Sequence, residues 1–194
     1  MKKDIIEKIK IPDEIEFNVE NNEVSFRYEK IENKRKFNYY GIKIKKDERD
    51  IIIESKKATK KELKIIKTII AHINNMVKGL KEPFIYKMEI AFLHFPISID
   101  YNQLEKKIVI KNFLGEKKPR SVNIPDRVDV KIDKNFVIIS SHDKETAGQA
   151  AANIEKATHV KNRDRRKFQD GIFIIKKPKE KIILSQKIEE KIGK

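Results

Sequence analysis

The chain has 194 residues, no cysteine and a formal net charge of +15. Without cysteine, a disulfide framework, a thiolate metal site and a cysteine nucleophile are excluded. No apolar run reaches the roughly 18–20 residues that span a bilayer, and residues 1–8 lack the apolar core of a signal peptide. We therefore expect a cytoplasmic protein with no membrane contact. The positive charge indicates a polyanionic partner, above all a nucleic acid.

The first half of the chain carries runs of alternating apolar and polar residues, a pattern typical of strands with one buried face. These runs are 15–20, 24–28, 42–45 and 50–55. Thr59 and Glu62 then fit a capping box, in which both side chains satisfy free amide groups at a helix start. Apolar residues recur at helical spacing as far as Gly79, which is a stop signal. A further run, 84–90, is predicted to be the last strand of this half.

The second half repeats this order of elements. Its alternating runs are 97–101, 107–111, 128–132 and 135–140. Asp143 can cap a helix that extends to about Thr158, and small residues on the inner face of that helix would let it lie close to its sheet. The run 172–175 is predicted to be the closing strand.

Two landmarks recur at nearly one spacing in the two halves. Pro12 and Pro96 lie 84 residues apart, and Ser55 and Ser140 lie 85 apart. We predict an α+β protein made of two tandem copies of a small domain, each a mostly antiparallel sheet with one helix packed across it. The predicted divisions are a first repeat at 1–92, a second repeat at 93–177 that is the main RNA-binding half, and a basic tail at 178–194.

Arginine is concentrated in the second half. Only 8 of the 45 basic residues are arginine, and three of those fall within 163–166. A guanidinium group holds phosphate at two points, whereas lysine offers a point charge. This stretch therefore indicates contact with a nucleic-acid backbone. A second basic patch, 111–120, contains a glycine and a proline that favour a shaped loop. The alternative of solvated surface charge is weaker for the arginine-rich stretch and stays open for the loop.

The sequence contains no recognisable catalytic or metal-binding motif. Metalloprotease, nucleophile-elbow, phosphate-loop and dinucleotide fingerprints are absent. The histidines have no second ligand at metal spacing; they are His72, His94, His142 and His159. We expect no catalytic residue, no metal, no cofactor and no small-molecule substrate. Two alternatives stay open: a free RNA-processing enzyme whose acidic residues converge on folding, and a basic adaptor that binds acidic proteins or membranes.

The aromatic residues are few and fall mostly on strand positions that should face inward. Proteins that bind single strands usually present aromatic side chains on which bases stack. The pattern therefore favours recognition of a folded RNA through its shape and backbone.

Three runs of the second half carry a family resemblance: KNFLGEK (111–117), GQAAANIE (148–155) and RDRRKFQDGI (163–172). With NMVKG (75–79) and HFPI (94–97), they resemble the large-subunit ribosomal protein six family, and the residues of the third run are typical of its archaeal members. The resemblance spans roughly Ile9 to Lys177. The chain departs from the family in 28–40, which lacks a Gly-Pro-rich hairpin, and in the lysine-rich stretch after Lys177.

The resemblance implies two copies of one α+β fold and a structural, non-enzymatic role in the large ribosomal subunit, in support of translation. It also implies binding of large-subunit ribosomal RNA near the sarcin–ricin loop and the factor-binding region, beside neighbouring ribosomal proteins. The residues expected to contact RNA are Lys111, Asn112, Lys117, Lys118, Arg120, Lys161, Asn162, Arg163, Arg165, Arg166 and Lys167. Gly115 and Gly171 are expected to shape the backbone there.

Overall fold

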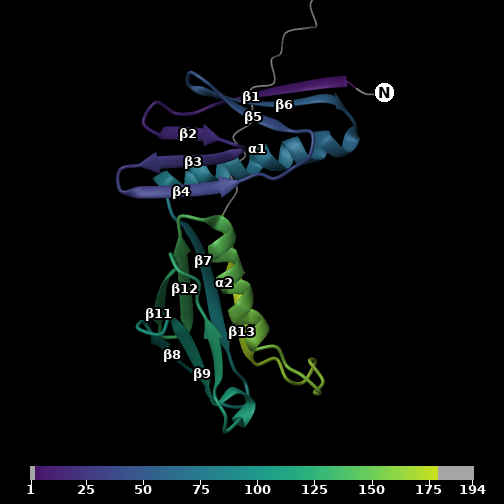
Figure 1. Ribbon diagram of the computed structural model, residues 1–194. Coiled ribbons are helices and arrows are strands. Elements are labelled where there is room, and N and C mark those ends of the chain that lie inside the picture. Colours follow the sequence, from purple (N-terminus) through teal and green to yellow (C-terminus); the bar gives the residue numbers. More distant parts are fainter. Residues whose placement is uncertain (1–2, 179–194) are drawn as a thin grey trace, which may run out of the picture.

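Two α+β units follow each other along the chain in the computed structural model, which describes residues 3–178 (Figure 1). The first unit contains β1 (Lys3–Lys10), β2 (Glu16–Glu20), β3 (Glu23–Tyr28), β4 (Ile31–Lys36), β5 (Lys43–Asp47), β6 (Asp50–Ala58) and α1 (Lys60–Lys81). The second contains β7 (Phe84–Ala91), β8 (Ser98–Asn102), β9 (Lys107–Lys111), η1 (Phe113–Gly115), β10 (Arg120–Asn123), β11 (Asp129–Asp133), β12 (Phe136–Ser141), α2 (Lys144–Ala157) and β13 (Gly171–Lys176).

The predicted fold class is confirmed, because each unit combines antiparallel strands with one long helix. The sheets have the orders β1-β6-β5 and β2-β3-β4 in the first unit, and β11-β12-β7-β13 and β10-β9-β8 in the second. Every strand pairing among the described residues is antiparallel. Each unit thus holds two small sheets where the sequence predicted one. The predicted tail lies outside the described residues, apart from Pro178.

Strand β7 belongs to the second unit, which corrects the predicted boundary after residue 92. It lies between β12 and β13, with Met88 opposite both Val137 and Ile174. Its inward side chains are part of the core of the second unit. The second unit therefore begins at about Phe84, and β7 opens it just as β1 opens the first unit beside β6. Alternation in a sequence predicts which face of a strand is buried, but it leaves the partner strands open.

The burial pattern also corrects one landmark of the internal repeat. In β6 the buried serine is Ser55, whereas in β12 it is Ser141 and not Ser140. A shift of one residue along a strand turns the side chain to the opposite face, so Ser55 corresponds to Ser141. The spacing of 84 does hold for the buried pairs of β3 and β9, which are Val24 with Phe26 and Ile108 with Ile110.

Both predicted helix starts are confirmed. Thr59 donates its backbone N–H to the Glu62 carboxylate at 2.7 Å, and its hydroxyl accepts the N–H of Lys61 at 3.2 Å. Asp143 accepts the N–H of Glu145 at 3.1 Å at the start of α2. These bonds satisfy amide groups that the first turn of a helix leaves free. The inner face of α2 is also as predicted: its buried residues are Ala147, Ala150, Ala151 and Ile154.

Gly79 does not end α1, which continues to Lys81. A Cβ atom at this position would lie only 2.0 Å from the backbone oxygen of His142. The glycine therefore serves a close approach between the two units, and the His142 ring binds the Gly79 carbonyl at 2.7 Å. This contact joins the end of α1 to the start of α2.

A second contact joins the units through the first turn of α2. The Glu145 carboxylate lies 2.8 Å from the Arg35 guanidinium and 3.1 Å from Nδ1 of His72. Burial, helped by the charge of Arg35, lowers the pKa of His72 below its ordinary value.

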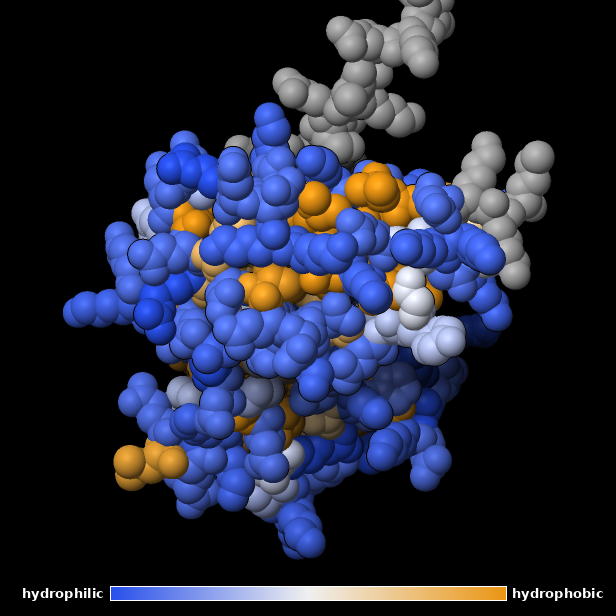
Figure 2. Space-filling view, turned by 45° about the horizontal axis from the view of Figure 1, so that its top comes forward, coloured by the Kyte–Doolittle hydropathy of each residue, from blue (hydrophilic) through white to orange (hydrophobic). Residues whose placement is uncertain are grey.

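The outer surface is strongly polar. Figure 2 shows a face that is mainly hydrophilic, with small apolar patches between charged side chains. Neither helix of residues 3–178 is long and apolar enough to cross a membrane.

Candidate nucleic-acid interface

The predicted contact residues lie in two loops at one end of the second unit. The 111–120 loop contains the last residue of β9, the η1 turn and the first residue of β10, and the 161–170 loop joins α2 to β13. Both lie at the end of this unit that faces away from the first unit (Figure 1). Because α2 starts against the first unit and has 14 residues, the loops are about 20 Å from that contact. The structure thus brings all predicted contact residues to one end of the second unit.

Arg120 ties the two loops together. Its Nη1 donates to the Ala157 carbonyl at 2.6 Å, at the end of α2, and its Nε and Nη2 bind the Glu116 carboxylate at 2.8 and 2.6 Å. The guanidinium also lies 4.2 Å from the centre of the Phe113 ring. Its side chain is only 23% exposed. Most of its donors are therefore used within the chain, and it is the predicted contact residue with least capacity left for phosphate.

The Glu116 carboxylate balances that arginine. Hydrogen bonding from Arg120 lowers the pKa of Glu116 below its ordinary value, with a smaller electrostatic contribution from Arg163. The contribution of Arg163 also indicates that the two loops lie close enough for their charges to interact. Glu116 is consequently ionised at neutral pH, and the pair with Arg120 holds the base of the loop.

The 111–120 loop has an unusual backbone. Asn112 has φ +58 and donates its side-chain amide to the Pro96 carbonyl at 3.0 Å, while Gly115 has φ +76. Side chains rarely adopt this left-handed conformation, and a Cβ on Gly115 would meet the Phe95 ring at 3.4 Å. Lys111 pairs with Asp100 at 2.7 Å, but both side chains are exposed, so this pair is weak in water.

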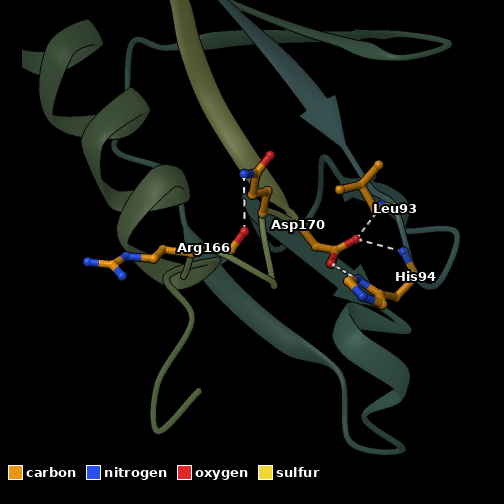
Figure 3. A network of polar contacts seen from close by, with 5 residues as sticks. Leu93, His94, Arg166 and Asp170 are labelled. Atoms are coloured by element: carbon orange, nitrogen blue, oxygen red, sulfur yellow. Dashed lines mark hydrogen bonds and ion pairs between the residues drawn. The ribbon is translucent and has the colours of Figure 1, made fainter. Parts of the chain in front are cut away.

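The 161–170 loop is built around a tight turn at Asp164. The Asp164 carbonyl accepts the backbone N–H groups of Lys167 and Phe168 at 3.1 and 2.9 Å, and its carboxylate accepts the N–H of Arg166 at 2.9 Å. Gln169 donates to the Arg166 carbonyl at 3.3 Å, and the Arg166 guanidinium extends away from this network (Figure 3). These bonds hold the backbone while leaving the basic side chains directed outward.

A buried acid, Asp170, anchors the same loop. It is 1% exposed and accepts the backbone N–H groups of Leu93 and His94, the second at 3.1 Å, and it contacts the His94 ring at 2.7 Å (Figure 3). Burial raises the pKa of Asp170, but the hydrogen bonds from Leu93 and His94 outweigh it and hold the pKa below its ordinary value. The acid is therefore charged at neutral pH and fixes the end of β7 to the start of β13.

The anchor extends into a stack of rings. The His94 ring lies 4.8 Å from the Phe168 ring in a stacked arrangement, and the Arg163 guanidinium lies 4.9 Å from the centre of the same ring. Sequence reasoning missed His94 and Asp170 as parts of this surface. Both belong to runs that carry the family resemblance, and that was the one signal that pointed to them. Gly171 follows Asp170 and is buried; a Cβ there would lie 2.8 Å from the Phe173 ring.

Seven lysine and arginine side chains of these loops are exposed and form no ion pair with any residue in the described part of the chain. They are Lys117, Lys118, Lys161, Arg163, Arg165, Arg166 and Lys167. Beside them, an open groove of about 860 Å³ is lined by residues that include His159, Arg165, Phe168 and Phe173. Basic side chains that form no ion pair within the protein can replace the counterions of a nucleic-acid backbone. No cluster of His, Asp and Glu that could hold a metal ion occurs within residues 3–178.

Comparison with known proteins gives the family of the chain. The model of the family "Ribosomal protein L6" matches residues 98–171, which contain both loops. Proteins named large ribosomal subunit protein uL6 are similar over nearly the whole chain. The one from Methanothrix thermoacetophila is 38% identical, covering 91% of this chain and 99% of its own. Those from Methanococcus vannielii and Methanobrevibacter smithii are each 40% identical, covering 89% of this chain and 94% and 96% of their own. The resemblance found in the sequence is therefore confirmed, and the chain belongs to the ribosomal protein L6 (uL6) family in its archaeal form.

Proposed function

We propose that the protein is a structural constituent of the cytoplasmic large ribosomal subunit and binds large-subunit ribosomal RNA through the 111–120 and 161–170 loops. We place this contact near the sarcin–ricin loop and the factor-binding region, beside neighbouring ribosomal proteins. As a ribosomal protein it supports translation by holding RNA in shape, and it catalyses no reaction. Membership of the L6 family and the names of the relatives support this assignment.

The observation that supports the RNA contact is that seven basic side chains without an ion-pair partner lie together at one end of the second unit. Each lysine or arginine that neutralises a phosphate releases counterions and makes the slope of log affinity against log salt more negative by about 0.7–0.9. If all seven make contacts, the slope is about −5 to −6. Affinity then falls roughly 10³-fold when salt rises fourfold. Arginine in this set allows two-point contact with phosphate, which also fixes orientation.

The other contacts of these two loops position the basic side chains and do not form a catalytic site. The turn at Asp164 and the anchor at Asp170 hold the loop before RNA arrives, so little loop ordering accompanies binding. Arg120 fixes the neighbouring loop to the end of α2. The first unit contacts the start of α2 and leaves the loop end clear.

Two experiments test the proposal. The endogenous protein should sediment with large ribosomal subunits and leave them only at high salt. In reconstituted particles, hydroxyl-radical footprinting should show RNA protection near the sarcin–ricin loop that disappears in the variant R163A/R165A/R166A. The matched control K60A/K64A/K67A removes the same charge from exposed positions of α1 and should retain the protection.

Other outcomes separate the alternatives. Protection elsewhere in the RNA would refute the proposed location but keep the RNA contact. Absence from ribosomal particles, together with metal-dependent cleavage of ribosomal RNA, would favour the enzyme. Flotation with acidic liposomes in preference to RNA at equal salt would favour the adaptor.

A further inference from the structure

The segment between β7 and β8 exposes large apolar side chains. Phe92, Leu93 and Phe95 are 42%, 72% and 45% exposed, although they are nearly consecutive. Isolated apolar residues on a surface need no explanation, but a cluster of three next to a binding surface does. We call residues 92–95 the apolar ridge.

The apolar ridge lies between the two basic loops. On one side, Phe95 contacts the position of Gly115 in the 111–120 loop. On the other, the backbone N–H groups of Leu93 and His94 are held by Asp170 of the 161–170 loop (Figure 3). The ridge is therefore fixed in place by both loops. Its His94 ring stacks on the Phe168 ring at 4.8 Å, and the Arg163 guanidinium lies 4.9 Å from the centre of that Phe168 ring.

Building on the proposed RNA contact, we infer that the apolar ridge contacts unpaired bases of the bound RNA, with Phe92 as a stacking surface and Leu93 as a wedge. Unstacked bases of RNA loops and bulges are recognised by stacking on aromatic side chains, and apolar residues such as Phe and Leu insert between base steps. The phosphates of the same RNA segment would be held by the lysine and arginine side chains of the two flanking loops.

The charge around the ridge selects RNA over a protein partner. The two flanking loops carry nine Lys and Arg residues and three Asp and Glu residues. The apolar core of a protein interface is depleted of charge, whereas binding of single-stranded nucleic acid combines a basic groove with exposed rings. Of the other aromatic residues, four are buried, namely Phe26, Phe37, Tyr86 and Phe113, whereas Tyr39, Tyr40 and Phe173 are exposed.

The test uses the full chain and two RNA probes of equal length: a stem-loop with an unpaired purine loop and a fully paired duplex. The variant F92A/L93A removes two of the three exposed apolar side chains of the ridge and keeps the backbone bonds to Asp170. The control is L104A, because Leu104 is 97% exposed at the opposite end of the β8–β9 hairpin from Lys111. We expect F92A/L93A to lose about tenfold or more in affinity for the stem-loop. Its duplex affinity and salt slope should match those of L104A.

The possible results are distinct. Equal losses for both probes would mean that the ridge only supports the loops, and would overturn the inference. Unchanged affinity for both probes would mean that the ridge does not contact RNA bases, and would overturn the inference as well. The variant R163A/R165A/R166A should lose affinity for both probes with a shallower salt slope. If this variant bound both RNAs like the unaltered protein, the proposed function itself would fail, whatever F92A/L93A does.

Discussion

Replacing Gly79 by alanine should weaken the contact between the two units. The new Cβ would lie 2.0 Å from the His142 oxygen and 2.9 Å from the Phe84 ring. Ordinary carbon–oxygen contacts are about 3.3 Å or longer, so the end of α1 has to move by more than 1 Å. That movement also breaks the hydrogen bond of 2.7 Å between the His142 ring and the Gly79 carbonyl.

Opposing effects decide how much Gly79→Ala changes the free energy of unfolding. Alanine stabilises a helix by roughly 0.5–1 kcal/mol relative to glycine. Overpacking destabilises by typically about 1–3 kcal/mol, and the lost hydrogen bond contributes about 1 kcal/mol more. The net expectation is that Gly79→Ala lowers the free energy of unfolding by about 1–3 kcal/mol. Helix propensity alone would predict the opposite sign, so the measurement separates the two explanations.

Urea unfolding monitored by circular dichroism measures this difference, with small-angle scattering to report the arrangement of the units. Thr68→Ala is the control, because Thr68 is exposed on the same helix and should change stability by no more than about 0.5 kcal/mol. RNA affinity should also be retained, since the loops lie at the far end of α2. A Gly79→Ala variant that is as stable as the unaltered protein would refute the close approach.

Other predictions concern buried polar groups. The Ser55 hydroxyl is buried without a hydrogen-bond partner among the described residues, so Ser55→Ala should be neutral or slightly stabilising. Ser141→Ala should destabilise by about 1 kcal/mol, because that hydroxyl donates to the Arg127 carbonyl at 2.7 Å; urea unfolding compares the two. The lowered pKa of Asp170 contributes stability above the unfolded pKa of about 3.9, and this is lost as pH falls through the folded pKa. Asp170→Asn should flatten that acid dependence in pH-resolved unfolding, and an unchanged profile would contradict the anchor. Arg120→Lys should speed hydrogen exchange in the 111–120 loop, because lysine cannot bind Glu116 and the end of α2 together.

Local features of the fold could be read from the sequence. The capping box at Thr59, the cap at Asp143 and the alanine face of α2 depend on neighbours within a few residues, and all are present. Strand β4 was not predicted, because its alternation is carried by charged residues with few apolar ones. The partners of β7 were also mispredicted, since its pairing with β12 and β13 joins residues far apart in the chain.

The candidate surface shows the same division. The arginine cluster was apparent from composition. The structure places both basic loops at one end of the second unit, and contact of their residues with RNA stays a prediction. The sequence did not predict that Arg120 is used inside the fold, nor that Asp170 reaches back 76 residues to His94.

The sequence by itself determined the composition, the helix caps, the buried faces of most strands and the family. These depend on residue type and short spacing. Tertiary structure alone decided which strands pair, why Gly79 is needed and which basic side chains remain unpaired. Those properties arise from contacts between residues distant in the chain, and no local pattern records which distant group will meet which.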